Sequence, residues 1–489
     1  MSPAIIISSI ACYFGILLMI AWYTSRGANN ESYFLANKSA PWYAVAFGMI
    51  SDSLSGVTFI SVPGSVGASQ FSYMQVVLGY FFGYFIIAHV LLPLYYNRNL
   101  TSIYTYLLQR FGKFSQKTGS FYFLLSRMLG AAARLYLTAS VIQLFVFDAM
   151  GVPFWVSVSI IIGLILLYTY KGGIKTLVWT DTFQSSFLLL GVVLSIAAIA
   201  SELDFGIKDV FSAVADSSLT KTFFWDWQQK SFFPKQFIGG IFIAIAMTGL
   251  DQNMMQKNLS CRSLADAQKN IRWFSVVMVL VNVFFLSLGV LLYIYADTLS
   301  INHQPLTILK TDFLFPTLAL EHLGAFAGIV FIVGLTAATF SSADSVLTTL
   351  TTSFMIDFLG KGQGTEDEGQ VTKTRHLTHI AFAVILLAVI LLFRALNTQA
   401  IIDTVLMLAG YTYGPLLGLF FFGIFTKRNV RDKFVPVVCL LSPVLCYVLN
   451  ENSKAWFGGY LFGNELLIVN GLLTFGGLYI INPKSLKGL

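Results

Sequence analysis

Apolar runs of about 18–25 residues recur from one end of this chain to the other, and a helix of that length crosses a lipid bilayer. Only 11% of the 489 residues are charged, less than half of the roughly 25% found in soluble domains. We therefore predict an all-α polytopic membrane protein with about thirteen transmembrane helices, in contact with the lipid bilayer. The runs lie at about 4–24, 42–67, 72–96, 119–148, 152–170, 178–201, 236–256, 272–297, 323–357, 376–394, 400–425, 433–450 and 463–482.

Positive charges divide unevenly between the loops on the two sides of these spans. Of the 30 Lys and Arg residues, 21 fall on one side, including Lys257 after the seventh run, 7 fall on the other, and Arg127 and Arg134 lie within a span. Cytoplasmic loops carry the excess of Lys and Arg in membrane proteins. We therefore expect a multi-pass protein of the plasma (inner) membrane with its N-terminus outside and its C-terminus in the cytoplasm. Because these loops account for the net charge of +7, we expect no nucleic-acid partner.

The chain carries no motif typical of an enzyme or of a zinc site. The four cysteines form no CxxC pair, and no HExxH, GxSxG or phosphate-loop sequence is present. We therefore predict that the protein is not an enzyme. Any transport would draw its energy from an ion gradient.

The second span contains "GMISDSLSGVTFISVPGSVG" (48–67), a poor sequence for a continuous helix because Gly, Ser and Pro interrupt it. Unwound backbone at membrane depth is tolerated where it lines a cavity, and its carbonyls can then coordinate a cation. A merely kinked helix whose serines bond to their own turn explains the stretch equally well.

A polar stretch, "GLTAATFSSADSVLTTL" (334–350), interrupts the ninth run. On a helix one face would carry small residues, hydroxyls and one carboxylate, at Ala337, Ala338, Ser341, Asp344, Ser345, Thr348 and Thr352. These oxygens suit a hard cation. A stripe used only for helix packing is the alternative, but a carboxylate at membrane depth is costly and usually functional.

Asp181 lies just inside the sixth span, in "KGGIKTLVWTDTFQSSF". It is a candidate ion ligand. A carboxylate near a helix N-terminus, favoured by the helix dipole, is the alternative.

Two arginines, Arg127 and Arg134, share one face of the fourth span, and Arg134 falls near mid-membrane. Arg134 either neutralises an intramembrane aspartate or grips an anionic group of a substrate with two hydrogen bonds. The residues alone leave both possibilities open.

Spans two to six and seven to eleven form two sets of five. Because five is odd, the second set starts from the opposite face, which permits an inverted repeat with a binding site near the bilayer midplane.

Five segments together resemble the solute:sodium symporter family, relatives of the sodium/glucose, sodium/proline and sodium/sialic-acid carriers. They are "GMISDSLSG", "GGIKTLVWTDTFQ", "GLDQNMMQKNLSCRSLADAQ", "GLTAATFSSADS" and "GYTYGPLLGLFFFG", in this order over most of the chain. The resemblance implies a single transmembrane domain, 1–489, with the five-plus-five inverted repeat of leucine-type transporters. One extra helix (4–24) would precede the repeats at 42–201 and 236–425, and two extra helices (433–482) would follow them.

The resemblance also implies where ions and solute bind. A main sodium site would use the carbonyls of Ser51, Leu54 and Ala338 and the hydroxyls of Ser341 and Ser342. Some members hold a second sodium ion, whose ligands are matched here by Asp181 and Ser345, with Asp344 where such members can have a serine. The substrate-site candidates, by placement, are Ser55, Thr58, Tyr73, Gln75, Arg134, Tyr411 and Tyr413.

We predict a sodium-driven secondary symporter that imports a small polar organic solute by alternating access and functions as a monomer. Arg134 favours a carboxylate-bearing solute, such as a sugar acid, over a neutral sugar. A proton-coupled symporter of the same fold and a membrane sensor that binds solute without moving it are the alternatives.

Overall fold

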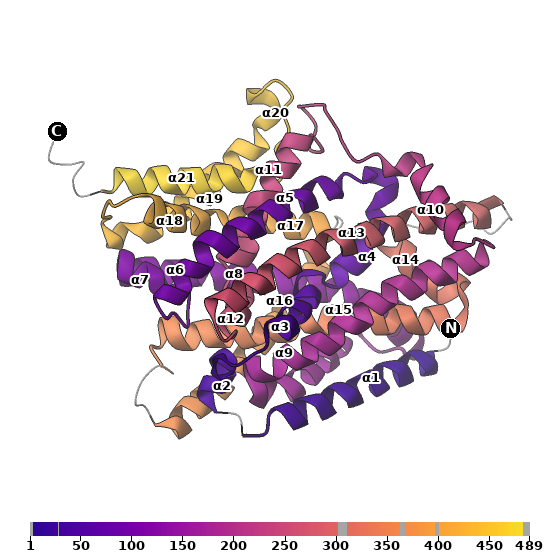
Figure 1. The fold of residues 1–489 in the computed structure, drawn as a ribbon, viewed down its shortest axis with the longest axis horizontal. Coiled ribbons are helices and arrows are strands. Elements are labelled where there is room, and N and C mark those ends of the chain that lie inside the picture. Colours follow the sequence, from indigo (N-terminus) through magenta and orange to yellow (C-terminus); the bar gives the residue numbers. More distant parts are fainter. Residues whose placement is uncertain (1–2, 28, 302–310, 362–366, 397–400, 483–489) are drawn as a thin grey trace.

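The computed structural model describes residues 3–27, 29–301, 311–361, 367–396 and 401–482, and within these ranges it contains helices and no strands (Figure 1). Lys310, Lys484 and Lys487, which enter the charge count above, lie outside the described residues. Eight described helices are long and apolar enough to cross a membrane, three bent helix pairs pass the same test jointly, and two shorter apolar helices remain. Together they match the thirteen predicted spans one for one.

The spans are built from fifteen named helices. They are α1 (Pro3–Thr24), α3 (Trp42–Ser53), α4 (Gly56–Ser69), α5 (Tyr73–Ile86), α8 (Lys113–Ile142), α9 (Phe154–Glu202), α11 (Phe233–Ala244), α12 (Gln252–Leu259), α13 (Leu264–Ile301), α15 (Gly324–Ser353), α16 (Glu368–Leu396), α17 (Ile401–Thr412), α18 (Gly414–Phe425), α19 (Val435–Glu451) and α21 (Leu466–Ile480).

Short helices continue or connect the spans. They are α2 (Asn30–Leu35), α6 (Leu92–Asn97), α7 (Thr105–Arg110), α10 (Ile207–Ala215), α14 (Leu314–Thr317) and α20 (Ser453–Trp456). Turns of 3₁₀ or π helix occur at Ala36–Lys38, Ile87–Leu91, Gln143–Phe147, Asp148–Met150, Ser218–Thr220, Ile245–Gly249, Thr311–Phe313, Leu318–His322, Phe354–Phe358 and Asp432–Phe434.

Two predicted spans, 152–170 and 178–201, form the single element α9, which is broken at Gly173. This glycine has φ +51°, a left-handed conformation that disfavours other residues. A Cβ atom at this position would lie 2.5 Å from the carbonyl oxygen of Tyr33. Gly173 therefore both breaks α9 and lets α2 pack directly against it.

Two broken helices occupy corresponding positions in the two halves of the chain. The axes of α3 and α4 differ by 56°, and those of the segment Phe233–Gly249 and α12 differ by 63°. Each pair opens one of the two predicted repeats, the placement expected where inverted repeats form a site at the membrane midplane.

Helix α15 lies in the centre of the molecule. Every residue from Gly334 to Ser353 is buried, and α15 packs against α1, α3, α4, α8, α9, α12 and α16 (Figure 1). Its hydroxyl groups therefore face other helices and not lipid.

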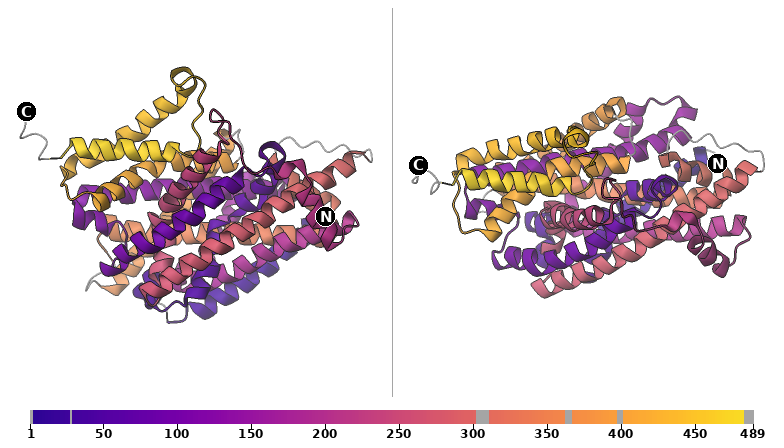
Figure 2. Two further views of the ribbon diagram at one scale, coloured as in Figure 1. Left: turned by 45° about the horizontal axis from the view of Figure 1, so that its top comes forward. Right: turned by 90° about the horizontal axis from the view of Figure 1, so that it is seen from above.

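The last spans form a separate layer at one side of this centre. Helices α18, α19 and α21 pack against one another, and both views in Figure 2 show them side by side. The start of α1 and the end of α21 lie at opposite ends of the bundle (Figures 1 and 2), as an odd number of spans requires.

Candidate ion and substrate sites

The first broken helix interrupts its backbone at Leu54 and Ser55. Leu54 has φ −94° and ψ 75°, and Ser55 is extended with ψ 177°. In the part of the chain that the structure describes, no backbone N–H donates to the carbonyl oxygens of Ser51 or Leu54. These two carbonyls are therefore free to coordinate a cation.

Gly56 allows this break to approach α15 closely. A Cβ atom at residue 56 would lie 2.3 Å from Oγ1 of Thr339 and 2.8 Å from Oγ1 of Thr138. These two hydroxyl groups are themselves hydrogen-bonded at 2.6 Å. Any larger side chain at position 56 would push the broken helix away from α15.

Two of the predicted main sodium ligands meet beside this contact. The hydroxyls of Ser51 and Ser341, 290 residues apart in sequence, lie 2.6 Å apart. The other three predicted ligands, Leu54, Ala338 and Ser342, are buried as well. Hydroxyl and carbonyl oxygens are ligands that suit a hard cation such as sodium.

Asp181 adjoins this site from α9. Its carboxylate accepts a hydrogen bond of 3.2 Å from Ser341, and its backbone carbonyl accepts one of 3.3 Å from Ser51. The structure therefore places Asp181 next to the predicted main sodium site, with the side chain oriented into the protein.

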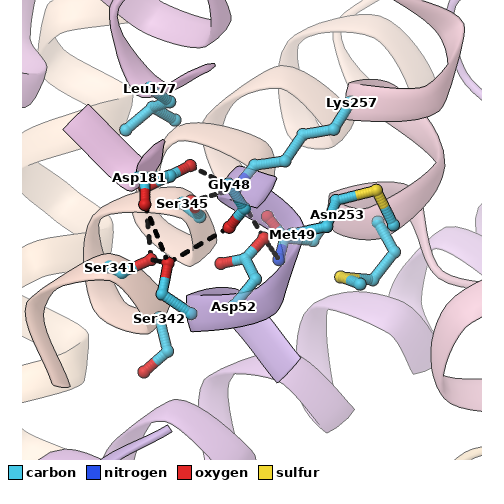
Figure 3. A network of polar contacts seen from close by, with 12 residues as sticks. Gly48, Met49, Asp52, Leu177, Asp181, Asn253, Lys257, Ser341, Ser342 and Ser345 are labelled. Carbon is cyan, nitrogen blue, oxygen red and sulfur yellow. Dashed lines mark hydrogen bonds and ion pairs between the residues drawn. The ribbon is translucent and has the colours of Figure 1, made fainter. Parts of the chain in front are cut away.

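Lys257 fills the space between Asp181 and the predicted second-site serine (Figure 3). Its ammonium lies 2.5 Å from Oδ2 of Asp181, 2.6 Å from Oδ2 of Asp52 and 2.9 Å from Oγ of Ser345. The side chain is 1% exposed. Counting Lys257 among the loop cations was therefore wrong. The segment around Lys257 is polar, which is typical of a loop. It forms α12, however, which is the buried second half of a broken helix.

Asp344 does not join this cluster directly. Its Oδ2 accepts a hydrogen bond of 2.8 Å from the hydroxyl of Tyr168 in α9. Its Oδ1 has no hydrogen-bond partner among the described residues. No hydrogen bond or ion pair joins Asp344 to Lys257 or Ser345 in the described ranges. Among the described residues, Asp181 and Ser345 thus share Lys257, whereas Asp344 bonds to Tyr168.

A cavity opens beside the break in the first broken helix. Its polar lining is made by Asp52, Ser53, Ser55, Thr58, Tyr73, Tyr80, Tyr84, Arg127, Arg134 and Thr248. Leu54 also lines it, so the cavity adjoins the predicted main sodium site. Four of the predicted substrate residues, Ser55, Thr58, Tyr73 and Arg134, are therefore grouped around one space.

The other three predicted substrate residues do not line this cavity. The amide of Gln75 donates 2.9 Å and 3.2 Å hydrogen bonds to the carbonyls of Ser231 and Ser72. The ring of Tyr411 lies 6.2 Å from that of Tyr447 in α19. Tyr413 is buried, and its hydroxyl donates a hydrogen bond to the carboxylate of Asp251.

The two arginines of α8 differ in their partners. Arg127 forms an ion pair of 2.5 Å with Asp251, whose Oδ2 also accepts a 2.6 Å hydrogen bond from Tyr413. Arg134 is only 9% exposed, and it forms no ion pair or hydrogen bond with any described residue. The predicted neutralisation of an aspartate by Arg134 is therefore absent from this conformation.

Sequence reasoning missed Lys257 and also Asn253, one turn before it in α12. Asn253 donates to Asp52 at 3.2 Å and accepts a 3.2 Å hydrogen bond from Thr349. A signal was present, because buried carboxylates are paired with cations and the predicted spans contain more aspartates than lysines and arginines.

Comparisons with known proteins identify the family of this chain. A family model described as the sodium:solute symporter family matches residues 33–432. The sodium/sialic acid symporter NanT of Aliivibrio fischeri is 26% identical over 476 residues, covering 94% of this chain and 91% of that protein. The sodium/sialic acid symporter SiaT of Proteus mirabilis is 25% identical over 473 residues, covering 94% and 92%.

A solved structure shares the fold. It is a substrate-bound, outward-open state of a Na⁺-coupled sialic acid symporter, with a TM-score of 0.82 and 23% identity over 97% of both chains. The likeness confirms the predicted fold class.

Proposed function

This chain belongs to the sodium:solute symporter family, and on that premise we propose that it imports a small carboxylate-bearing solute, with a sugar acid as the favoured class. Membership confirms the predicted family, sodium as the coupling ion and a transporter rather than an enzyme. We propose the identity of the solute and the mechanism by which it is transported.

One observation carries the choice of solute: the buried guanidinium of Arg134, which has no partner among the described residues, lines the cavity. The carboxylates of Asp181 and Asp251 are bound by Lys257 and Arg127, and Asp52 also pairs with Lys257. Arg134 thus keeps its donors for a ligand. A carboxylate matches a guanidinium with two parallel hydrogen bonds. The names of the two bacterial relatives, which carry sialic acid, agree with an acidic sugar.

The hydroxyl-rich part of the lining suits the rest of such a solute. Ser55, Thr58 and Tyr73 present O–H groups to the cavity that holds Arg134, and each can donate or accept a hydrogen bond. Asp52 lines the same cavity and can accept hydrogen bonds from sugar hydroxyls. A purely apolar acid would leave these groups unsatisfied.

Sodium and solute would be coupled through the break at residues 54 and 55. Leu54 belongs to the proposed sodium site and to the cavity lining, and Ser55 follows it directly. An ion that fixes this break also fixes the cavity wall, so it favours the conformation that binds solute. Release toward the cytoplasm would follow rocking of one set of helices against the other, as in alternating access.

We further propose a monomeric transporter of the plasma membrane with its N-terminus outside and its C-terminus in the cytoplasm. Its repeats would span 42–201 and 236–425, with extra helices at 4–24 and 433–482. All ligands proposed for ion and solute come from one chain, which supports a monomer as the functional unit.

Thermal shift and uptake measurements test the proposal. The purified protein is screened against sugar acids, neutral sugars and amino acids, in sodium and in choline. We expect a sugar acid to raise the melting temperature only when sodium is present, because bound ligands stabilise by RT ln(1 + [L]/Kd). In proteoliposomes the same solute should accumulate when a sodium gradient is imposed.

The role of Arg134 is tested with Arg134→Ala and the matched surface change Arg262→Ala. Removing one partner of a buried charge pair costs about 2–5 kcal/mol, so the Kd for the solute should rise roughly 30-fold or more. Arg262 is exposed, and its variant should bind normally. Unchanged affinity in Arg134→Ala would exclude this carboxylate site.

Uptake driven by a pH gradient without sodium would support the alternative of a proton-coupled symporter. Binding of the solute without counterflow would support the alternative of a membrane sensor.

A further inference from the structure

We propose that Lys257 is a built-in cation that occupies the place of a second sodium ion, so that this symporter moves one sodium ion per transport cycle. The inference rests on the proposed function, since it specifies the ion stoichiometry of the same site. This proposal explains why Asp181, a residue predicted to bind a second sodium ion, is already paired with the ammonium group of Lys257.

The ammonium of Lys257 is fully engaged. A lysine has three N–H donors, and Lys257 has three acceptors: Oδ2 of Asp181 at 2.5 Å, Oδ2 of Asp52 at 2.6 Å and Oγ of Ser345 at 2.9 Å. Two of these acceptors, Asp181 and Ser345, are the residues predicted to hold the second sodium ion. Figure 3 shows the side chain of Lys257 directed from α12 into this group of oxygens.

A sodium ion cannot share these oxygens with the ammonium. An ion that bound Oδ2 of Asp181 and Oγ of Ser345 would compete with Nζ for the same two oxygens. Its charge and that of the ammonium would repel each other in a buried setting of low dielectric constant. The third predicted ligand, Asp344, is hydrogen-bonded to Tyr168 instead. The main site keeps its own ligands, because Lys257 makes no hydrogen bond to Ser51, Ser341 or Ser342 in the described part of the chain.

A tethered cation differs from a sodium ion because it cannot be released. Lys257 links α12 to Asp52 in α3, Asp181 in α9 and Ser345 in α15. It supplies the positive charge that these carboxylates require in every conformation, without using the sodium gradient. One sodium ion carries one positive charge and a monoanionic solute carries one negative charge. Together they move no net charge across the membrane. Uptake would therefore be electroneutral.

The stoichiometry can be counted directly on the purified, full-length protein. Equilibrium binding of ²²Na⁺ should give one ion per wild-type protein. The double variant Lys257→Met with Asp52→Asn removes the ammonium and one carboxylate together, so the net charge of the cluster is kept. We expect this variant to bind two ions, with a Hill coefficient that rises from about one toward two. Adding Asp181→Asn should return the count to one.

Controls separate this inference from the proposed function. Lys373 is an exposed lysine of α16, and Lys373→Met should leave the count at one. A wild-type protein that binds two ions would overturn the tethered-cation proposal while leaving the symporter proposal intact. A folded double variant that keeps its first ion but gains no second would overturn it as well. A wild-type protein that binds no sodium would overturn the proposed function and this inference with it.

A second readout uses proteoliposomes. Uptake of a monoanionic solute by the wild type should be insensitive to a membrane potential set with potassium and valinomycin. In the double variant, an inside-negative potential should accelerate the same uptake. Potential-dependent uptake of a monoanion by the wild type would contradict a single coupled sodium ion.

Discussion

At the scale of single residues, the buried charges of this protein have distinct partners. Asp52 and Asp181 share Lys257, Asp251 pairs with Arg127, and Arg134 faces the cavity alone among the described residues. Unpaired buried charges are costly. A buried guanidinium that lines a cavity and has no ion-pair partner among the described residues therefore indicates a charged ligand.

The hydroxyls of α15 provide a prediction at this scale. In Ser341→Ala with Ser342→Ala, two proposed sodium ligands are lost, and each missing polar contact costs about 1–3 kcal/mol. We expect the Kd for sodium to rise roughly 5- to 150-fold for each hydroxyl, measured as sodium-dependent melting temperature. Thr336 supplies the control Thr336→Val, because among the described residues its hydroxyl bonds only to Ile332 of its own helix, at 2.6 Å. Sodium binding that survives both serine changes would show that the ion lies elsewhere.

At the scale of helices, function depends on two breaks and on the central α15 that passes between them. The break at residues 54 and 55 exposes carbonyl groups, and the second break positions α12 so that Lys257 reaches Asp52 and Asp181. Continuous helices would satisfy these backbone groups internally and would move the lysine away. The breaks therefore create the site.

A glycine substitution tests the contact between the first break and α15. Gly56→Ala would place a methyl group 2.3 Å from Oγ1 of Thr339, and overpacking of this kind costs about 1–3 kcal/mol. We expect lower stability and a weaker sodium affinity, because the carbonyl of Leu54 would move away from Ser341. Gly130 of α8 has open space around it, so Gly130→Ala should leave sodium affinity unchanged. If Gly56→Ala bound sodium normally, the close approach would not be needed for the site.

At the scale of the whole molecule, the sites lie deep in the bundle and the charged loops lie at its ends. The start of α1 and the end of α21 lie at opposite ends of the bundle (Figure 1). This arrangement agrees with thirteen spans. From the charge distribution we expect the face that bears more Lys and Arg to lie in the cytoplasm.

Cysteine labelling in intact cells tests this orientation. Lys208→Cys in α10 should react with a membrane-impermeant maleimide from outside, whereas Lys427→Cys, after α18, should react only once the membrane is permeabilised. Among the native cysteines, Cys12 is exposed and is replaced by serine. Burial raises the pKa of the Cys261 thiol to about 12, so little reactive thiolate forms at neutral pH. Labelling of both variants from the same side would contradict the topology.

The sequence by itself determined the number of spans, the family and the pairing of the two polar stretches around residues 51 and 341. Hydrophobic length and helical periodicity are local properties, and they survive in any packing of the chain. Only the tertiary structure decided which charges pair. It moved Lys257 from an expected loop into the cation cluster, bonded Asp344 to Tyr168, and left Gln75 and Tyr411 out of the cavity lining. The direction of a side chain near a helix break depends on how distant helices pack around it, and no local pattern of residues contains that information.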